Sequence, residues 1–180
     1  MSTKTLATFL ILLSTTLAYG TQTKTEWIRF TSPEGRFSVL LPHEPKFEAV
    51  ITDPQVKEVT NYRYTELEDG YGFICEYYDV SSTGADLEAF LDVTRDGIIR
   101  GAAATKVGED KINLGDYPGR ELALAFTVNN ATNITARTRI FIVGKRLYSL
   151  TYMHLKDADT KLALETGTKF FSSFKITASN

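Results

Sequence analysis

The sequence predicts an α+β fold in which helices cover a largely antiparallel β-sheet. Runs rich in β-branched and aromatic residues alternate with turn signals along residues 27–80 and again along residues 106–155. Each run is followed by a segment whose apolar residues recur at helical spacing. The connections between strands are short enough for hairpins, so neighbouring strands are expected to run antiparallel.

The first hairpin is expected to begin at Trp27. Trp27–Phe30 and Phe37–Leu41 read as strands, and Ser32–Gly35 between them holds proline and glycine at turn positions. Pro42 and Pro45 follow closely. Because proline has no backbone N–H to donate to a ladder, these residues are expected to end the second strand.

Three further strands are predicted before residue 81. They are Phe47–Thr52, Val56–Leu67 and Tyr71–Val80. Asp69-Gly70 precedes the third strand, and this dipeptide between two strands favours a tight hairpin.

An amphipathic helix is predicted after the break at Ser81–Gly84. Thr83 and Asp86 resemble a capping box, and Gly101 offers a C-terminal stop. Four apolar residues fall at helical spacing and are expected to face the sheet: Leu87, Phe90, Leu91 and Ile98.

Four more strands are predicted between residues 106 and 155. Turn signals at Gly115–Gly119, Asn129-Asn130 and Gly144-Lys145 separate them, and Pro118-Gly119 is expected to form a tight turn before a strand. The strands include Leu122–Val128, Thr135–Val143 and Leu147–Leu155. Arg120 and Glu121, being adjacent on one strand, are expected to point to opposite faces.

A second helix is expected to close the fold, capped by Asp157. Its apolar face holds Ala163, Gly167, Phe170, Phe171 and Phe174. The two small residues allow the helix to approach the sheet closely, and each buried phenylalanine contributes about 1.5–3 kcal/mol.

Residues 1–20 have the pattern of a secretory signal peptide. Lys4 precedes the apolar run Leu6–Leu13, and Ala18 and Gly20 provide the small side chains that signal peptidase requires at a cleavage site. Residues 21–26 are polar and are interpreted as a disordered linker, which leaves residues 27–176 as a single α+β domain. The protein is therefore predicted to be exported, to the periplasm or outside the cell.

The composition excludes several functional classes. The chain has 20 basic and 22 acidic side chains, and only Lys4 falls within the leader, so the mature part carries a net charge of −3. We therefore expect no nucleic-acid partner. The apolar leader segment is shorter than a membrane span, which disfavours its retention as a signal anchor, and no stable membrane insertion is expected after cleavage. Cys75 has no cysteine to pair with and is interpreted as a small buried hydrophobe rather than a reactive thiol.

No catalytic or metal-binding motif is recognisable. The histidines are His43 and His154, and neither belongs to a zinc motif, so both are interpreted as structural or solvent-facing. A nucleophilic pair of Cys75 with His154 would require the fold to bring them together, and it stays an open alternative. We predict no cofactor, no metal and no enzymatic activity.

Other acidic and basic residues are explained by structural roles rather than by ligand binding or catalysis. Asp157 and Asp159 have calcium-ligand chemistry, but helix capping accounts for them. Gly144–Arg146 is interpreted as a hairpin turn with a solvated basic tip rather than a phosphate loop. Glu76 and Asp79 are three positions apart on one strand, so their carboxylates should lie on opposite faces.

The tyrosines are the unusual feature of the chain. Five of them lie within seventeen residues: Tyr62, Tyr64, Tyr71, Tyr77 and Tyr78. Tyr62 and Tyr64 share one strand face and are the candidate binding surface. Cross-strand aromatic packing is the alternative explanation for the same pattern. Asn130 and Asn133 both fit the N-glycosylation pattern at a predicted hairpin tip.

Several segments together resemble a known family. They are Trp27–Pro42, Tyr117–Glu121, Val143–Leu150 and Phe170–Phe174. The chain resembles small exported bacterial proteins of unknown function with the PsbP-like α/β/α fold, which also includes a lumenal extrinsic subunit of photosystem II and a Ran-binding nuclear protein. The resemblance implies an antiparallel sheet covered by helices and roles in binding rather than catalysis. It assigns no site residue.

The leading functional hypothesis is an exported, non-enzymatic domain that binds a protein or an envelope component. Eleven phenylalanines and nine tyrosines favour an alternative, a carrier that holds a small apolar ligand between sheet and helix. An unrecognised hydrolase using His43, His154 or Cys75 is the third hypothesis.

Overall fold

A computed structural model describes residues 26–51, 60–68, 70–80 and 86–177. The predicted leader with Ala18 and Gly20, most of the predicted linker, and Thr83 lie outside these residues.

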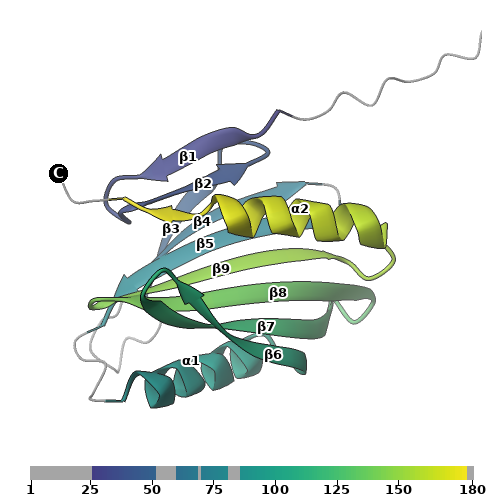
Figure 1. Cartoon of the computed structure of the whole chain (residues 1–180). Coiled ribbons are helices and arrows are strands. Elements are labelled where there is room, and N and C mark those ends of the chain that lie inside the picture. The colour runs from purple at the N-terminus through teal and green to yellow at the C-terminus, as the bar shows by residue number, and fades with distance from the viewer. Residues whose placement is uncertain (1–25, 52–59, 69, 81–85, 178–180) are drawn as a thin grey trace, which may run out of the picture.

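A seven-stranded antiparallel sheet forms the centre of the molecule (Figure 1). Its strands, in spatial order, are β3 (Lys46–Ile51), β4 (Thr60–Glu68), β5 (Tyr71–Asp79), β9 (Arg146–Leu155), β8 (Thr132–Val143), β7 (Tyr117–Val128) and β6 (Thr105–Leu114). Each neighbouring pair is antiparallel. All pairs except β5 with β9 join consecutive strands, as the hairpin signals predicted.

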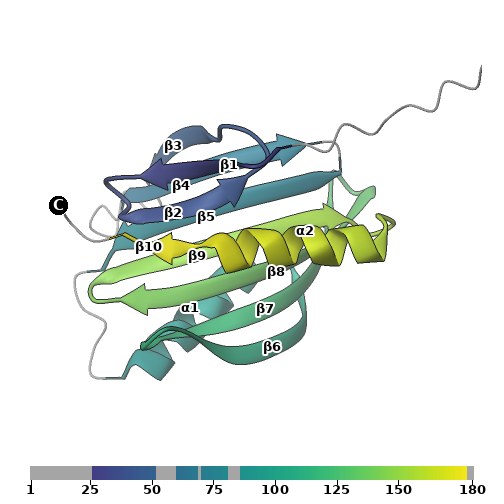
Figure 2. The same cartoon turned by 45° about the horizontal axis from the view of Figure 1, so that its top comes forward.

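One helix covers each face of this sheet. The helix α1 (Leu87–Gly101) contacts β7 and β8 on one face, and α2 (Thr160–Ser173) contacts β9 on the other. A small second sheet of β1 (Ile28–Ser32), β2 (Phe37–Leu41) and β10 (Lys175–Ile176) lies beside α2, over β4 and β5 (Figure 2). The predicted α+β class, with an antiparallel sheet between helices, is confirmed.

The core on the α2 side is built from aromatic rings. Phe37 of β2 is 1% exposed, and five rings surround it with centroid distances of 5.6–6.3 Å. They belong to Phe30, Tyr64, Tyr77, Tyr148 and Phe174. The small sheet is thereby attached to the large one through contacts between aromatic side chains.

The second helix approaches the sheet at Gly167, as predicted. A Cβ atom at this position would lie 2.7 Å from the ring of Tyr152, so only glycine fits without displacing that ring. Ala163, Phe170 and Phe171 are buried on the same helix face. Phe174 caps the helix C-terminus and is buried with them.

Both helix caps differ from the prediction. Asp86 is itself the N-cap of α1, where its Oδ1 accepts a hydrogen bond from the backbone N–H of Ala89 at 3.0 Å. Asp159 rather than Asp157 caps α2, accepting from the N–H of Leu162 at 2.8 Å. Any aspartate close to a helix start satisfies the sequence pattern, and the local backbone decides which one caps.

Two predicted turns also need correction. Pro118-Gly119 lies inside β7, and the turn is formed by Gly115 with Asp116 just before it. The turn at Gly144 is confirmed with Lys145 exposed at its tip, but Arg146 is not solvated. Its side chain donates to Asp79 and to the carbonyl oxygen of Glu34, so that it joins β9 to β5 and to the first hairpin.

Candidate functional site

Four side chains of β4 form a stripe on the face that the small sheet covers. They are Tyr62, Tyr64, Glu66 and Glu68, and the alternation of a strand places all of them on one side. Their partners on β5 are core residues, and three of the four are aromatic: Tyr77, Cys75, Phe73 and Tyr71. The stripe therefore changes along its length from aromatic to acidic.

The aromatic part of the stripe lines an open groove of about 490 Å³. Phe47 of β3 is 55% exposed and its ring lies 5.1 Å from that of Tyr64. Tyr62 stacks on Tyr77 at 4.9 Å, and Tyr77 is buried. Tyr64 is also buried, and its hydroxyl shares a 2.9 Å hydrogen bond with the Ser32 hydroxyl. The same aromatic rings therefore both pack against the core and line the groove.

Charged groups form one rim of this groove. The Arg146 guanidinium lies 4.7 Å from the centre of the Tyr77 ring and pairs with both carboxylate oxygens of Asp79, at 2.6 and 2.9 Å. These contacts hold the pKa of Asp79 below its usual range. Burial raises the pKa of Tyr77 to about 12, so its hydroxyl stays protonated at physiological pH. Glu34 completes the lining.

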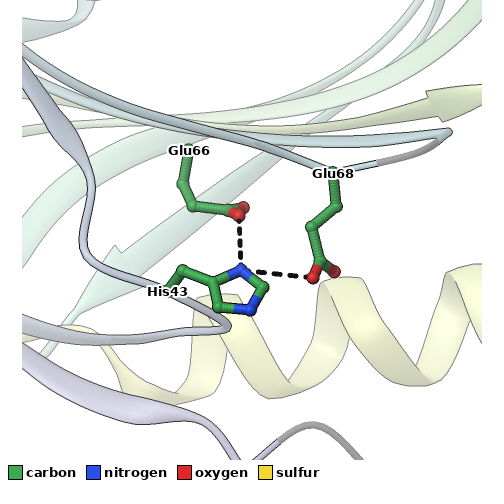
Figure 3. Close-up of side chains that lie close together, drawn as sticks. All are labelled: His43, Glu66 and Glu68. Carbon is green, nitrogen blue, oxygen red and sulfur yellow. Dashed lines mark hydrogen bonds and ion pairs between the residues drawn. The ribbon is translucent and has the colours of Figure 1, made fainter.

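The acidic part of the stripe meets His43, which follows β2 (Figure 3). The His43 Nδ1 atom lies 3.2 Å from Glu66 Oε1 and 3.2 Å from Glu68 Oε1. Glu66 is 5% exposed, whereas the His43 side chain is 58% exposed. The cluster is therefore anchored in the interior on one side and open to solvent on the other.

Glu66 is unusually buried for a carboxylate. Burial raises the pKa of Glu66, the hydrogen bond with His43 lowers it, and the neighbouring Glu68 charge raises it again, leaving the pKa above its usual value. Its Oε2 atom is buried and has no hydrogen-bond partner among the residues that the structure describes. A buried, unpaired carboxylate oxygen is costly.

The other candidate catalytic residues, Cys75 and His154, do not lie together in the structure. Cys75 pairs with Leu150 across β5 and β9, whereas His154 pairs with Tyr71, four positions further along β5. That separation is roughly 13 Å along a strand, so the two side chains form no nucleophilic pair. Cys75 is 1% exposed, and burial raises the pKa of its thiol, as expected for an inert core residue.

Other predictions about side-chain placement are confirmed. Glu76 pairs with Arg63 on one face of the sheet, while Asp79 pairs with Arg146 on the other. Asn130 lies in the exposed turn between β7 and β8, and Asn133 is exposed at the start of β8. Tyr71 stacks on Tyr152, and burial raises the pKa of Tyr78, consistent with packing roles.

Arg120 and Glu121 point to opposite faces of β7, as expected. Glu121 contacts Arg137 and Arg139 on the α2 side. Arg120 is buried beneath α1, where it pairs with Glu88 and Asp92. Acidic and basic side chains of α1, β6 and β7 line a second pocket here, of about 710 Å³. We interpret these charged side chains as an ionic layer that attaches α1 to the sheet.

This ionic layer predicts an acid-sensitive stability. Hydrogen bonds from Arg120 and Lys111 lower the pKa of Glu88 to about 2, against 4.5 for an ordinary glutamate. The stabilisation is complete above pH 4.5 and is lost as the pH falls from there toward 2, because the unfolded chain takes up the proton first. We expect Glu88→Gln to flatten the fall of unfolding free energy across this window, as measured by urea denaturation.

The matched control for this prediction is Glu165→Gln on the exposed side of α2, which should leave the pH dependence unchanged. Equal slopes for the Glu88 variant and the natural protein would show that the Arg120 contact does not contribute.

Comparison with solved structures identifies the fold as PsbP-like. The solution structure of cyanobacterial PsbP (CyanoP) from Synechocystis sp. PCC 6803 is 15% identical, with a TM-score of 0.59 over 87% of this chain and 96% of that one. The Saccharomyces cerevisiae Ran-binding protein Mog1p is 11% identical, with a TM-score of 0.51 over 86% and 97%. No family model matches the chain, and no curated protein matches it in sequence.

These likenesses confirm the fold that the sequence resemblance implied. At 11–15% identity they transfer no site residue. Neither described helix is long and apolar enough to span a bilayer.

Proposed function

We propose that the protein is exported and acts as a non-enzymatic binding domain, contacting an envelope protein through the groove of Phe47, Tyr62, Tyr64 and Tyr77. Export rests on the leader sequence with Lys4, Leu6–Leu13 and the small residues at its end. The groove supplies the contact surface.

The exposed ring of Phe47 above an ordered set of tyrosines is the observation that carries this proposal. Aromatic residues and arginine are enriched at protein interfaces, because they bury a large area at a small cost in conformational entropy. Here Tyr62 is held by stacking on buried Tyr77, and Arg146 is held by Asp79. The contact groups are thus positioned before a partner arrives, which lowers the cost of binding.

Two further observations support binding rather than catalysis. The candidate nucleophile Cys75 is buried and distant from His154 along the sheet. The yeast structure with a similar fold is named a Ran-binding protein, so the fold serves protein recognition in that case.

The alternative of an apolar-ligand carrier has less support. It requires space between sheet and helix, whereas Gly167 of α2 lies directly against the Tyr152 ring and Phe170 is fully buried there. The groove over β3 and β4 opens instead to the surface.

Photo-crosslinking in cells tests the proposal. A photoreactive amino acid at Phe47 is expected to give a discrete adduct with another protein, because this ring is exposed at the groove. The matched control is Val107, which is 70% exposed on β6 at the opposite edge of the sheet. Tyr62→Ala should reduce the Phe47 adduct several-fold.

Two outcomes would contradict the proposal. Equal background labelling at both positions would remove the groove as a contact surface. Recovery of the uncleaved chain, with its initiating methionine, from the cytoplasmic fraction alone would remove export.

A further inference from the structure

We propose that His43, Glu66 and Glu68 form a binding site for a divalent transition-metal ion of the zinc class. The three side chains come from two layers of the fold, β4 of the large sheet and the segment after β2 of the small sheet (Figure 3). One nitrogen and two oxygen ligand atoms lie within 4.8 Å of one another. This site is independent of the aromatic groove.

Two of the three ligand separations match what a zinc ion requires, and the third is within 4.8 Å. Zinc binds imidazole nitrogen and carboxylate oxygen at about 2.0–2.1 Å, which places tetrahedral ligand atoms about 3.3 Å apart. The His43 Nδ1 atom is 3.2 Å from one oxygen of each glutamate. The side chains could therefore bind the ion without rearrangement of the backbone.

An independent observation also points to a cation. Glu66 is only 5% exposed, and its Oε2 atom has no hydrogen-bond partner in the part of the chain that the structure describes. A second carboxylate, Glu68, lies on the same strand face two residues away. Two acids beside one imidazole, with one acid buried, leave an excess of negative charge that a divalent cation would neutralise.

The donor set selects the class of metal. Imidazole with carboxylates suits zinc and neighbouring transition ions, whereas magnesium and calcium prefer oxygen ligands alone. His43 is exposed on its outer side, so a fourth position would remain open to water. Three protein ligands with an open position is a common zinc arrangement.

Isothermal titration of the purified, chelator-treated protein with zinc chloride tests the site. We expect one zinc ion per chain and no comparable binding of magnesium. We expect each of three variants to weaken zinc binding about tenfold or more: Glu66→Gln, Glu68→Gln and His43→Gln. Even mutating a residue that only supports a metal ligand typically lowers metal affinity 10- to 100-fold. His43 is exposed, so its variant should fold even if the Glu66 variant does not.

Matched controls separate this site from adventitious binding. Glu44→Gln alters an exposed acid next to His43, and His154→Gln removes the other histidine, so both should bind zinc within about twofold of the natural protein. X-ray absorption at the zinc edge should show nitrogen and oxygen neighbours without sulfur.

Three results would overturn the proposal. They are zinc affinity unchanged in His43→Gln, equal loss in His154→Gln, or no stoichiometric binding at all. In the last case His43 serves only as an ion-pair partner of the two glutamates. Because Tyr62→Ala leaves all three ligands in place, failure of the groove proposal would not affect zinc binding.

Discussion

Replacing Gly119 with alanine is expected to destabilise the protein by about 3 kcal/mol or more. Gly119 lies in β7 opposite Phe141 of β8. A Cβ atom there would lie 2.3 Å from the carbonyl oxygen of Ile140 and 2.5 Å from the Phe141 ring. The carbonyl belongs to the backbone of a central strand, so β7 and β8 would have to separate to relieve the overlap.

Thermal unfolding provides the measurement. For a chain of this size, 3 kcal/mol corresponds to a fall in Tm of roughly 6–12 °C. Gly108→Ala on the neighbouring strand β6 is the control, because its Cβ would make an ordinary 3.7 Å contact with Ala123. A Tm for the Gly119 variant equal to that of the control would show that the two strands have room for the extra carbon.

Replacing Phe37 with alanine should cost about 3–5 kcal/mol of unfolding free energy, as measured by urea denaturation. The ring is nearly inaccessible, and its five aromatic neighbours belong to β1, β4, β5, β9 and the end of α2. Its removal leaves a cavity where the small sheet meets the large one. The neighbours are held by their own strands and cannot collapse into it fully.

Phe47→Ala is the matched control, since it removes the same side chain from an exposed position on β3. We expect it to cost about 1 kcal/mol or less. Similar losses for the two variants would mean that the aromatic core does not attach the small sheet. A folded Phe47 variant would also allow changes in the groove to be studied.

The strands were largely predictable because their signals are local. Phe37–Leu41 has the predicted bounds, since Pro42 directly follows it and a turn precedes it. The sequence pattern places the turn before β7 too late in the chain, because a Pro-Gly pair can also occur within a strand where the backbone of a neighbouring strand approaches closely. Gly119 is such a position, and only the register between β7 and β8 reveals it.

The site was predictable only in part. Alternation alone places Tyr62 and Tyr64 on one face, and the same rule extends to Glu66 and Glu68. His43 is 23 residues away from Glu66 and reaches it only because the small sheet lies over β4. No local spacing motif contains that information, so a search for metal motifs in the sequence could not find the cluster.

The small sheet joins the two ends of the described chain, because β10 pairs with β2 and the N–H of Thr177 donates to the carbonyl oxygen of Arg36. The N–H of Leu40 also donates to the Ser173 hydroxyl. During synthesis the apolar residues of β2 therefore emerge early, while part of what covers them, Phe174 and β10, is made last. The small sheet next to His43 is completed only then, and until that point its apolar side chains stay partly uncovered and are a natural target for chaperones.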